Sequence, residues 1–120
     1  MTRDQINAIC ALLPATTHVV QWGNSDVWKV GGKVFAVVGW SDDDGPAVSF
    51  KVSEMIYELM READGFRPAP YLASRGMTWL QIHAPDRVAE EDLRQHIEVS
   101  HELVAAKLTK KKRAELGLGG

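Results

Sequence analysis

The side chains with the clearest chemical potential in this 120-residue sequence are basic ones, set on predicted strands, loops and the C-terminal end. Cations distributed over one surface contact phosphates, so these residues are candidates for binding the backbone of a nucleic acid. The candidates are Lys29, Lys33, Lys51, Arg67, Arg75, Lys107, Lys110, Lys111, Lys112 and Arg113. The plainer alternative is that the strand lysines simply face solvent, while the C-terminal run complements a helix dipole. A net charge of −2 gives no general attraction to nucleic acid, so contacts must come from a local patch.

Large aromatic side chains form the second candidate group. Trp28, Trp40, Tyr71 and Trp79 belong to predicted strands or to a proline-rich segment, and an exposed ring there could stack on a base. A groove lined by such rings would instead hold a small planar molecule or a partner protein. The competing explanation is that strand alternation buries most of these rings in the core. The aromatic groove therefore stands as the alternative to nucleic-acid binding.

Patterns typical of catalysis and metal binding are missing from the sequence. It has no G-x-S-x-G motif, no Walker-type loop, no dinucleotide fingerprint and no Cys/His ligand cluster. Asp42, Asp43 and Asp44 form a turn in which three successive carboxylates do not converge on one ion. His96 and His101 are five residues apart, so they point to different faces of a helix. We expect a protein that is not an enzyme and that has no cofactor and no metal.

Length and composition are those of an ordinary globular chain. With 45% hydrophobic and 25% charged residues, we expect one domain covering residues 1–120. The single cysteine, Cys10, excludes an internal disulfide and is predicted to be a small buried hydrophobe. No apolar run approaches the ~20 residues of a membrane span, and no signal peptide is recognisable. These features favour a cytoplasmic protein with no membrane partner, and a monomer is the expected state.

A predicted meander of three strands between Asp26 and Ser53 organises the chain. Gly31-Gly32 separates two β-branched runs, which is a strong hairpin signal because both turn residues can adopt φ > 0. The turn at 41–46 leads into a third strand at 47–52. If a hairpin contacts DNA, Gly31-Gly32 is the better candidate, because the aspartates at 42–44 would repel phosphate.

The remaining segments predict helices and strands around this meander. Helices are expected at 2–13, where Thr2 and Gln5 form a capping box, from Ser53 to 64, and from about 89 to about 108. Further strands are expected at 18–23 and 77–83, an extended surface segment at 66–72, and a frayed basic end at 109–120. The order α-β-β-β-β-α-β-α predicts an α+β two-layer sandwich. Its antiparallel sheet has about five strands, with the N- and C-terminal helices on one face.

Several short pieces occur in a characteristic order over nearly the whole chain. They are Trp22-Gly23, 30–36 (VGGKVFA), 49–52 (SFKV), 68–72 (PAPYL), 78–80 (TWL), 100–104 (SHELV) and Leu108. This ordered set resembles the YjbR/MmcQ family of small bacterial proteins with a CyaY-like, frataxin-like fold, although His101 stands where that family usually has an aromatic residue. The resemblance implies the α+β fold given above and a DNA-binding role through a proposed double-wing arrangement of hairpins. The family has no established catalytic residues to carry over.

Overall fold

The structure, a computed structural model, describes residues 1–40, 45–70, 72 and 77–118, without the side chain of Trp40. Its elements are α1 (Arg3–Leu12), β1 (Thr16–Gln21), β2 (Ser25–Val30), β3 (Lys33–Trp40), β4 (Pro46–Lys51), α2 (Glu54–Met60), β5 (Phe66–Pro68), β6 (Trp79–Ile82), the 3₁₀ turn η2 (Pro85–Arg87), α3 (Glu90–Ala105) and α4 (Lys110–Glu115). In the described part of the chain, no helix is long and apolar enough to span a membrane.

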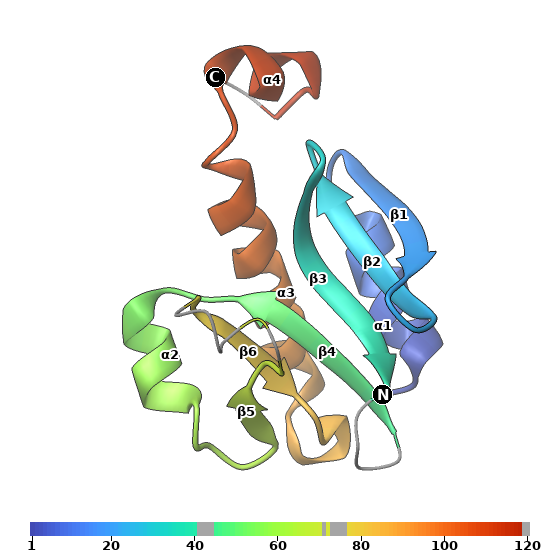
Figure 1. Cartoon of the computed structure of the whole chain (residues 1–120), viewed down its shortest axis with the longest axis vertical. Coiled ribbons are helices and arrows are strands. Elements are labelled where there is room, and N and C mark those ends of the chain that lie inside the picture. Colours follow the sequence, from blue (N-terminus) through green and yellow to red (C-terminus); the bar gives the residue numbers. More distant parts are fainter. Residues whose placement is uncertain (41–44, 71, 73–76, 119–120) are drawn as a thin grey trace.

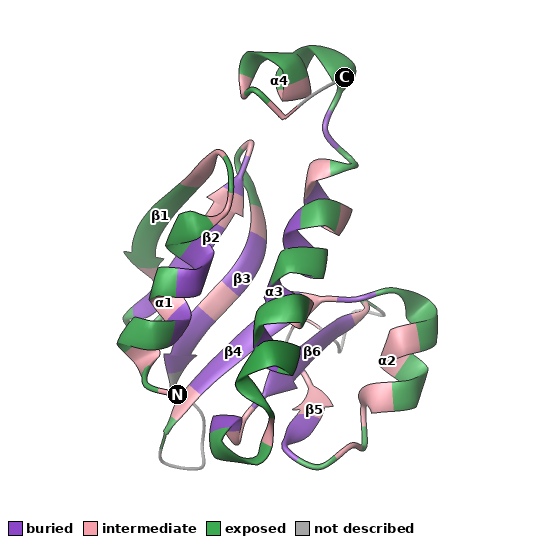
Figure 2. Ribbon diagram, turned by 180° about the vertical axis from the view of Figure 1, so that it is seen from behind, coloured by how far each residue is buried: buried purple, intermediate pink, exposed green. Residues whose placement is uncertain are grey.

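The strands form one six-stranded sheet in the order β1-β2-β3-β4-β6-β5, and all neighbouring pairs are antiparallel. Helices α1 and α3 cover the same face, behind the sheet in Figure 1 and in front of it in Figure 2. The predicted α+β class and the shared face of the first and last long helices are confirmed. The prediction of about five strands missed β5, because the prolines at 68 and 70 indicate an extended segment and not a strand, whereas Phe66 in fact pairs with Ile82 of β6.

The predicted hairpin joins β2 and β3 through Gly31 and Gly32, whose φ angles are +59° and +83°. Both residues thus adopt the left-handed conformation that side chains disfavour. The register between the two strands shifts next to this turn, since Trp28 faces Ala36 whereas Lys29 faces Val34. Phe35 is therefore the extra residue of a β-bulge.

A side chain from α3 forms hydrogen bonds with the backbone at this bulge. Ser100 is fully buried, and its hydroxyl donates to the Phe35 carbonyl at 2.7 Å and accepts from the Lys51 amide at 2.8 Å. Because Ala36 pairs with Phe50, residues 35 and 51 lie opposite each other on β3 and β4. The Ser100 hydroxyl therefore bridges the Phe35 carbonyl and the Lys51 amide in place of a direct backbone hydrogen bond between the two strands. The small side chain of Ser100 lets α3 approach the sheet closely, and its hydroxyl joins the hydrogen bonding of the sheet.

The core lies between the sheet and the two long helices. Its largest fully buried side chains are Phe35, Phe50, Ile6, Leu80, Ile82, Leu93, Ile97, Val27, Val30, Val38, Val48 and Cys10. The predicted capping box at Thr2 and Gln5 is present and starts α1. Burial raises the pKa of the Cys10 thiol to about 12, so this cysteine is a packing residue, as its apolar surroundings predict.

Element ends differ from the predicted ones where local backbone chemistry intervenes. Strand β1 begins at Thr16 and ends at Gln21, because Ala15 and Trp22 both adopt positive φ angles, +57° and +53°. The last long helix ends at Ala105 instead of about 108. The C-terminal segment 109–120, which was predicted to fray, contains helix α4. This helix starts at Thr109, whose hydroxyl accepts a hydrogen bond from the Lys112 amide.

Candidate nucleic-acid interface

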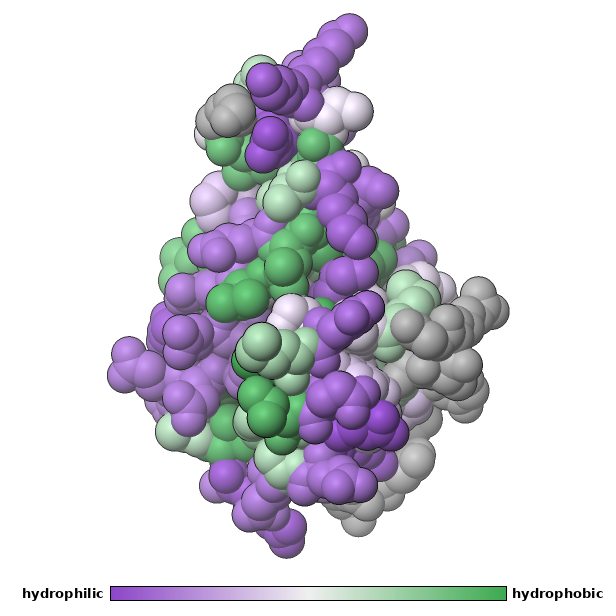
Figure 3. Space-filling view, turned by 90° about the vertical axis from the view of Figure 1, so that its left-hand side faces the viewer, coloured by the Kyte–Doolittle hydropathy of each residue, from purple (hydrophilic) through white to green (hydrophobic). Residues whose placement is uncertain are grey.

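The basic residues 110–112 lie on helix α4 at the upper end of the molecule in Figure 1. All three lysine side chains are exposed, as is Lys107 at the end of α3. Figure 3 shows hydrophilic side chains covering much of this end, seen from the α2 side. The structure thus presents the C-terminal lysines outward.

A packing contact brings the β2–β3 hairpin to the same end. A Cβ atom on Gly31 would lie 2.6 Å from the Leu108 side chain, so Leu108 packs directly on the backbone of the turn. Leu108 is only 8% exposed and links α3 to α4. The turn that Lys29 and Lys33 flank is therefore held against the segment that carries Lys107 and leads into α4.

Lys51 joins this group from the end of β4. Partial burial lowers the pKa of Lys51, and the charge and side-chain hydrogen bond of Lys107 lower it further. Two ammonium groups thus lie side by side, and in the described part of the chain neither has a carboxylate partner. We call the set Lys29, Lys33, Lys51, Lys107, Lys110, Lys111 and Lys112 the basic end.

The other candidate cations lie elsewhere. Arg67 is on β5, where its Nε donates to the Gln81 Oε1 at 2.7 Å, and Gln81 in turn donates to the Ser49 hydroxyl at 3.3 Å. Strand β5 lies at the opposite end of the molecule from α4 (Figure 1). Arg67 thus contributes to sheet packing away from the basic end, and Arg75 lies outside the described residues.

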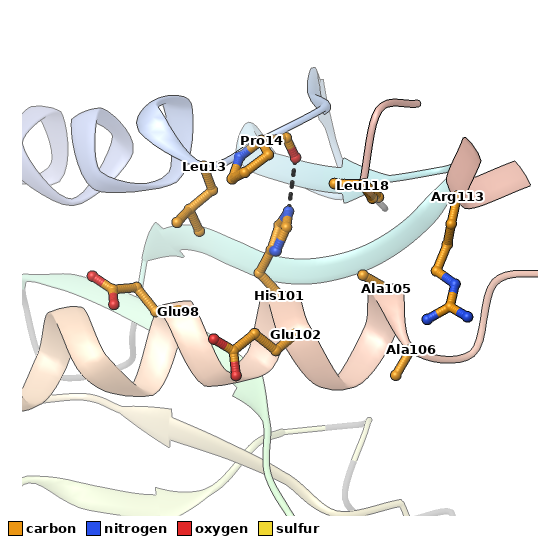
Figure 4. Close-up of a pocket in the computed structure, with 9 residues that line it drawn as sticks. All are labelled: Leu13, Pro14, Glu98, His101, Glu102, Ala105, Ala106, Arg113 and Leu118. Carbon is orange, nitrogen blue, oxygen red and sulfur yellow. Dashed lines mark hydrogen bonds between the residues drawn. The ribbon is translucent and has the colours of Figure 1, made fainter. Parts of the chain in front are cut away.

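Arg113 turns away from the lysines that precede it. It lines a cavity of about 360 Å³ between α3, α4 and the segment after α1, together with Leu13, Pro14, Glu98, His101, Glu102, Ala105, Ala106 and Leu118 (Figure 4). The Arg113 Nε is fully buried there and has no acceptor among the described residues. The sequence grouped Arg113 with its neighbours, but the helical turn sends it to another surface.

The histidine in this cavity has a structural role. His101 Nε2 lies 2.8 Å from the Pro14 carbonyl, and its ring packs edge-on against Phe35 at 5.1 Å. His96 stacks on Phe50. The two rings thus contact different phenylalanines of β3 and β4, and no group of three metal-ligating side chains occurs in the described ranges.

The predicted stacking residues are corrected by the structure in two cases. Trp28 is 8% exposed and its indole N–H donates to Asn7 at 2.9 Å, while Trp79 is 4% exposed. Trp28 belongs to the core cluster, and Trp79 lies in β6, whose four residues are all buried, so neither ring offers a face to a ligand. The side chain of Trp40 and all of Tyr71 lie outside the described residues. Trp22, which was not among the stacking candidates, is 58% exposed.

A polar cluster around Asp26 was not predicted from the sequence. The Asp26 carboxylate accepts from Arg3 Nε at 2.8 Å and Asn7 Nδ2 at 2.8 Å, and lies 2.7 Å from His18 Nε2. Burial alone would raise the pKa of Asp26, but these hydrogen bonds and the Arg3 charge outweigh it and hold the pKa below its usual value. The cluster fastens α1 to β1 and β2, and no sequence spacing announces it.

The fold and the basic end together define a small α+β protein whose distinctive surface is a concentration of lysines. The YjbR family model matches residues 11–103, and the chain belongs to the YjbR family. No curated protein matches the sequence.

Two solved structures are similar. The Deinococcus radiodurans protein DR2400, described as a DUF419 domain, is 27% identical with a TM-score of 0.84, covering 98% of this chain and 88% of that one. A protein from Pseudomonas syringae is 18% identical with a TM-score of 0.71, covering 87% of this chain and 99% of that one. The second likeness concerns the fold alone.

Proposed function

We propose that this chain is a non-enzymatic, cytoplasmic DNA-binding protein that contacts the phosphate backbone through the basic end. The supporting observation is the convergence of seven lysines from β2, β3, β4, the end of α3 and α4 on one part of the surface. Duplex DNA carries regularly spaced phosphates, and lysines bind them as point charges without reading sequence.

The contact between Lys51 and Lys107 gives this proposal a specific physical reason. Partial burial is the main cause of the lowered pKa of Lys51, and repulsion by the neighbouring ammonium group of Lys107 lowers this pKa further. A phosphate oxygen placed between the two ammonium groups would replace repulsion by two attractions. Binding of DNA is therefore expected to return the Lys51 pKa toward its usual value.

Fluorescence anisotropy with a labelled duplex, measured across a salt series, tests the proposal. The variant Lys110→Ala/Lys111→Ala/Lys112→Ala should bind more weakly. Its plot of log K against log salt should be shallower by about 0.9 for each phosphate contact that is lost. The matched control is Arg61→Ala/Arg87→Ala/Arg94→Ala, which removes the same charge from the end of α2, from η2 and from the first half of α3.

The two triple variants separate local contact from bulk charge. Near-normal affinity and slope in the arginine variant, with a loss in the lysine variant, support the basic end as the interface. Equal losses in both would mean that only net charge matters. Absence of binding at low salt, or binding that is indifferent to salt, contradicts the proposal.

A further inference from the structure

Within the described part of the chain, strand β1 forms one edge of the sheet and is paired only with β2. It has six residues, Thr16–Gln21, none of them lysine, arginine, aspartate, glutamate or proline. Edge strands usually avoid pairing with other chains by means of lysines, prolines, bulges or short length. Here the bulge lies between β2 and β3, so the outer edge of β1 has none of these protections.

The opposite edge of the sheet is protected. Strand β5 has three residues and ends at Pro68, which lacks an amide hydrogen. A β1 strand from another molecule would find few backbone partners there. Pairing of β1 with β5 would also lead to open chains of molecules, whereas pairing of β1 with itself closes as a dimer.

Side chains along β1 are exposed on both faces of the sheet. Val19 is 38% exposed and Val20 is 54% exposed, although they point to opposite faces. Trp22 follows directly and is 58% exposed, in a backbone conformation with a φ of +53° that a tryptophan rarely adopts. The edge therefore ends in a large aromatic side chain that would lose water on contact with a partner.

The turn that presents Trp22 is held from several sides. Trp22, Gly23 and Asn24 all have positive φ angles. The Ser25 hydroxyl donates to the Trp22 carbonyl at 3.2 Å, and Arg3 donates to the Asn24 carbonyl. Strained conformations that the surroundings maintain often serve a function, and aromatic anchors are common at interface centres.

We propose that two copies of this chain associate by antiparallel pairing of their β1 strands, which joins two six-stranded sheets into one. A second copy is the fitting occupant because a strand without lysine, arginine, aspartate or glutamate sets no such side chains against those of its own copy. An identical antiparallel strand also offers the matching donors and acceptors along the edge. The sequence alone favours a monomer, because the exposure of this edge is a property of the folded chain.

Symmetry restricts the register of this pairing. A two-fold axis between antiparallel edge strands keeps the helix-covered faces of both sheets on the same side. Directly opposed residues point to the same face, so the two residue numbers of each opposed pair must both be odd or both be even. The register with Val19 opposite Val19 of the second copy sets His18 against Val20 and Thr16 against Trp22. A strand edge alone is a small interface, so dissociation is expected at micromolar concentrations or above.

Sedimentation velocity over a concentration series of the full chain, combined with cysteine cross-linking, tests this proposal. The variant Val19→Cys should form a disulfide-linked dimer under mild oxidation. The matched control is Val99→Cys on α3, because Val99 has nearly the same exposure, 39%. Cross-linking at 19 should be about tenfold faster, since a disulfide requires Cβ atoms within about 4.5 Å. Cys10 is buried and does not compete.

A charge variant completes the test. Val19→Lys places two ammonium groups at the two-fold axis, so the dimer population should fall at least about tenfold, whereas Val99→Lys should leave it unchanged. The proposal is overturned by a wild-type chain that stays monomeric at every concentration. It is overturned equally by a Val99→Cys variant that cross-links as fast as Val19→Cys.

Discussion

The helix-covered face of the sheet and the basic end of the molecule differ in how their polar groups are partnered. Beneath α1 and α3, Ser100 bridges two strands and Asp26 collects hydrogen bonds from three side chains. At the basic end, Lys51 and Lys107 lie together, and no described carboxylate pairs with either. Polar groups under the helices therefore hold the fold, whereas those of the basic end contribute little to it and remain available to another molecule.

The largest expected effect is on the covered side, at Ser100. Ser100→Ala leaves the Phe35 carbonyl and the Lys51 amide without a partner inside the protein, which should lower the free energy of unfolding by about 3 kcal/mol. Urea unfolding followed by tryptophan fluorescence measures this. The matched control is Ser53→Ala, which removes the N-cap of α2 and should cost about 1 kcal/mol.

The same measurement on the lysine triple variant completes the contrast. Lys110, Lys111 and Lys112 are exposed, so their replacement by alanine should change the free energy of unfolding by less than about 0.5 kcal/mol. A loss in that variant as large as that of Ser100→Ala would show that the basic end supports the fold, which contradicts the division drawn here.

The expected loss of stability at Asp26 is smaller than that at Ser100. Asp26→Asn keeps the size of the side chain but sets a new amide donor against those of Arg3 and Asn7, which should cost about 2 kcal/mol at neutral pH. Because the folded pKa of Asp26 lies below its usual value, its stabilisation is present above about pH 4 and is lost as the pH falls through the folded pKa.

Urea midpoints at a series of pH values check the sign of this effect. The difference between the wild type and Asp26→Asn should be largest near neutrality and should shrink in acid. A difference that stays constant down to about pH 2 would mean that the Asp26 charge contributes nothing.

Most elements of the fold could be predicted from local sequence patterns, because helix caps and turns depend on only a few neighbouring residues. The capping box of α1 and the Gly31-Gly32 turn need only their neighbours in sequence. Strand β5 was missed since its pairing depends on β6, more than ten residues away. The restart of a helix at Thr109 was missed because a basic, glycine-ended segment resembles a frayed terminus.

The candidate site depended on contacts that no sequence spacing encodes. The lysines gather because Leu108 packs on Gly31 and because Lys51 reaches Lys107. Arg113 was grouped with them by position, yet it points into the cavity beside His101. Exposure decides the aromatic residues in the same way, since Trp28 is inside whereas Trp22 is outside.

A smaller effect on stability than at Asp26 is expected at His96, which packs at the edge of the helix-covered side. Its ring stacks on Phe50 at 5.1 Å and meets Phe66 edge-on at 5.5 Å. Burial lowers the pKa of His96, and the neighbouring Asp92 only partly opposes this. The folded chain therefore binds a proton here less readily than the unfolded chain, so its stability should fall as the pH drops below about 6.5.

Replacing His96 with phenylalanine should remove this loss while keeping the ring contacts. Between pH 7 and 5 the wild type should lose stability, and His96→Phe should lose less. Asp92→Asn should lose more than the wild type, because it removes the carboxylate that favours protonated His96. Urea midpoints at both pH values measure all three chains. If His96→Phe loses as much stability between pH 7 and 5 as the wild type, the acid sensitivity arises from a group other than His96. The helix-covered side would then contain another group whose protonation destabilises the fold.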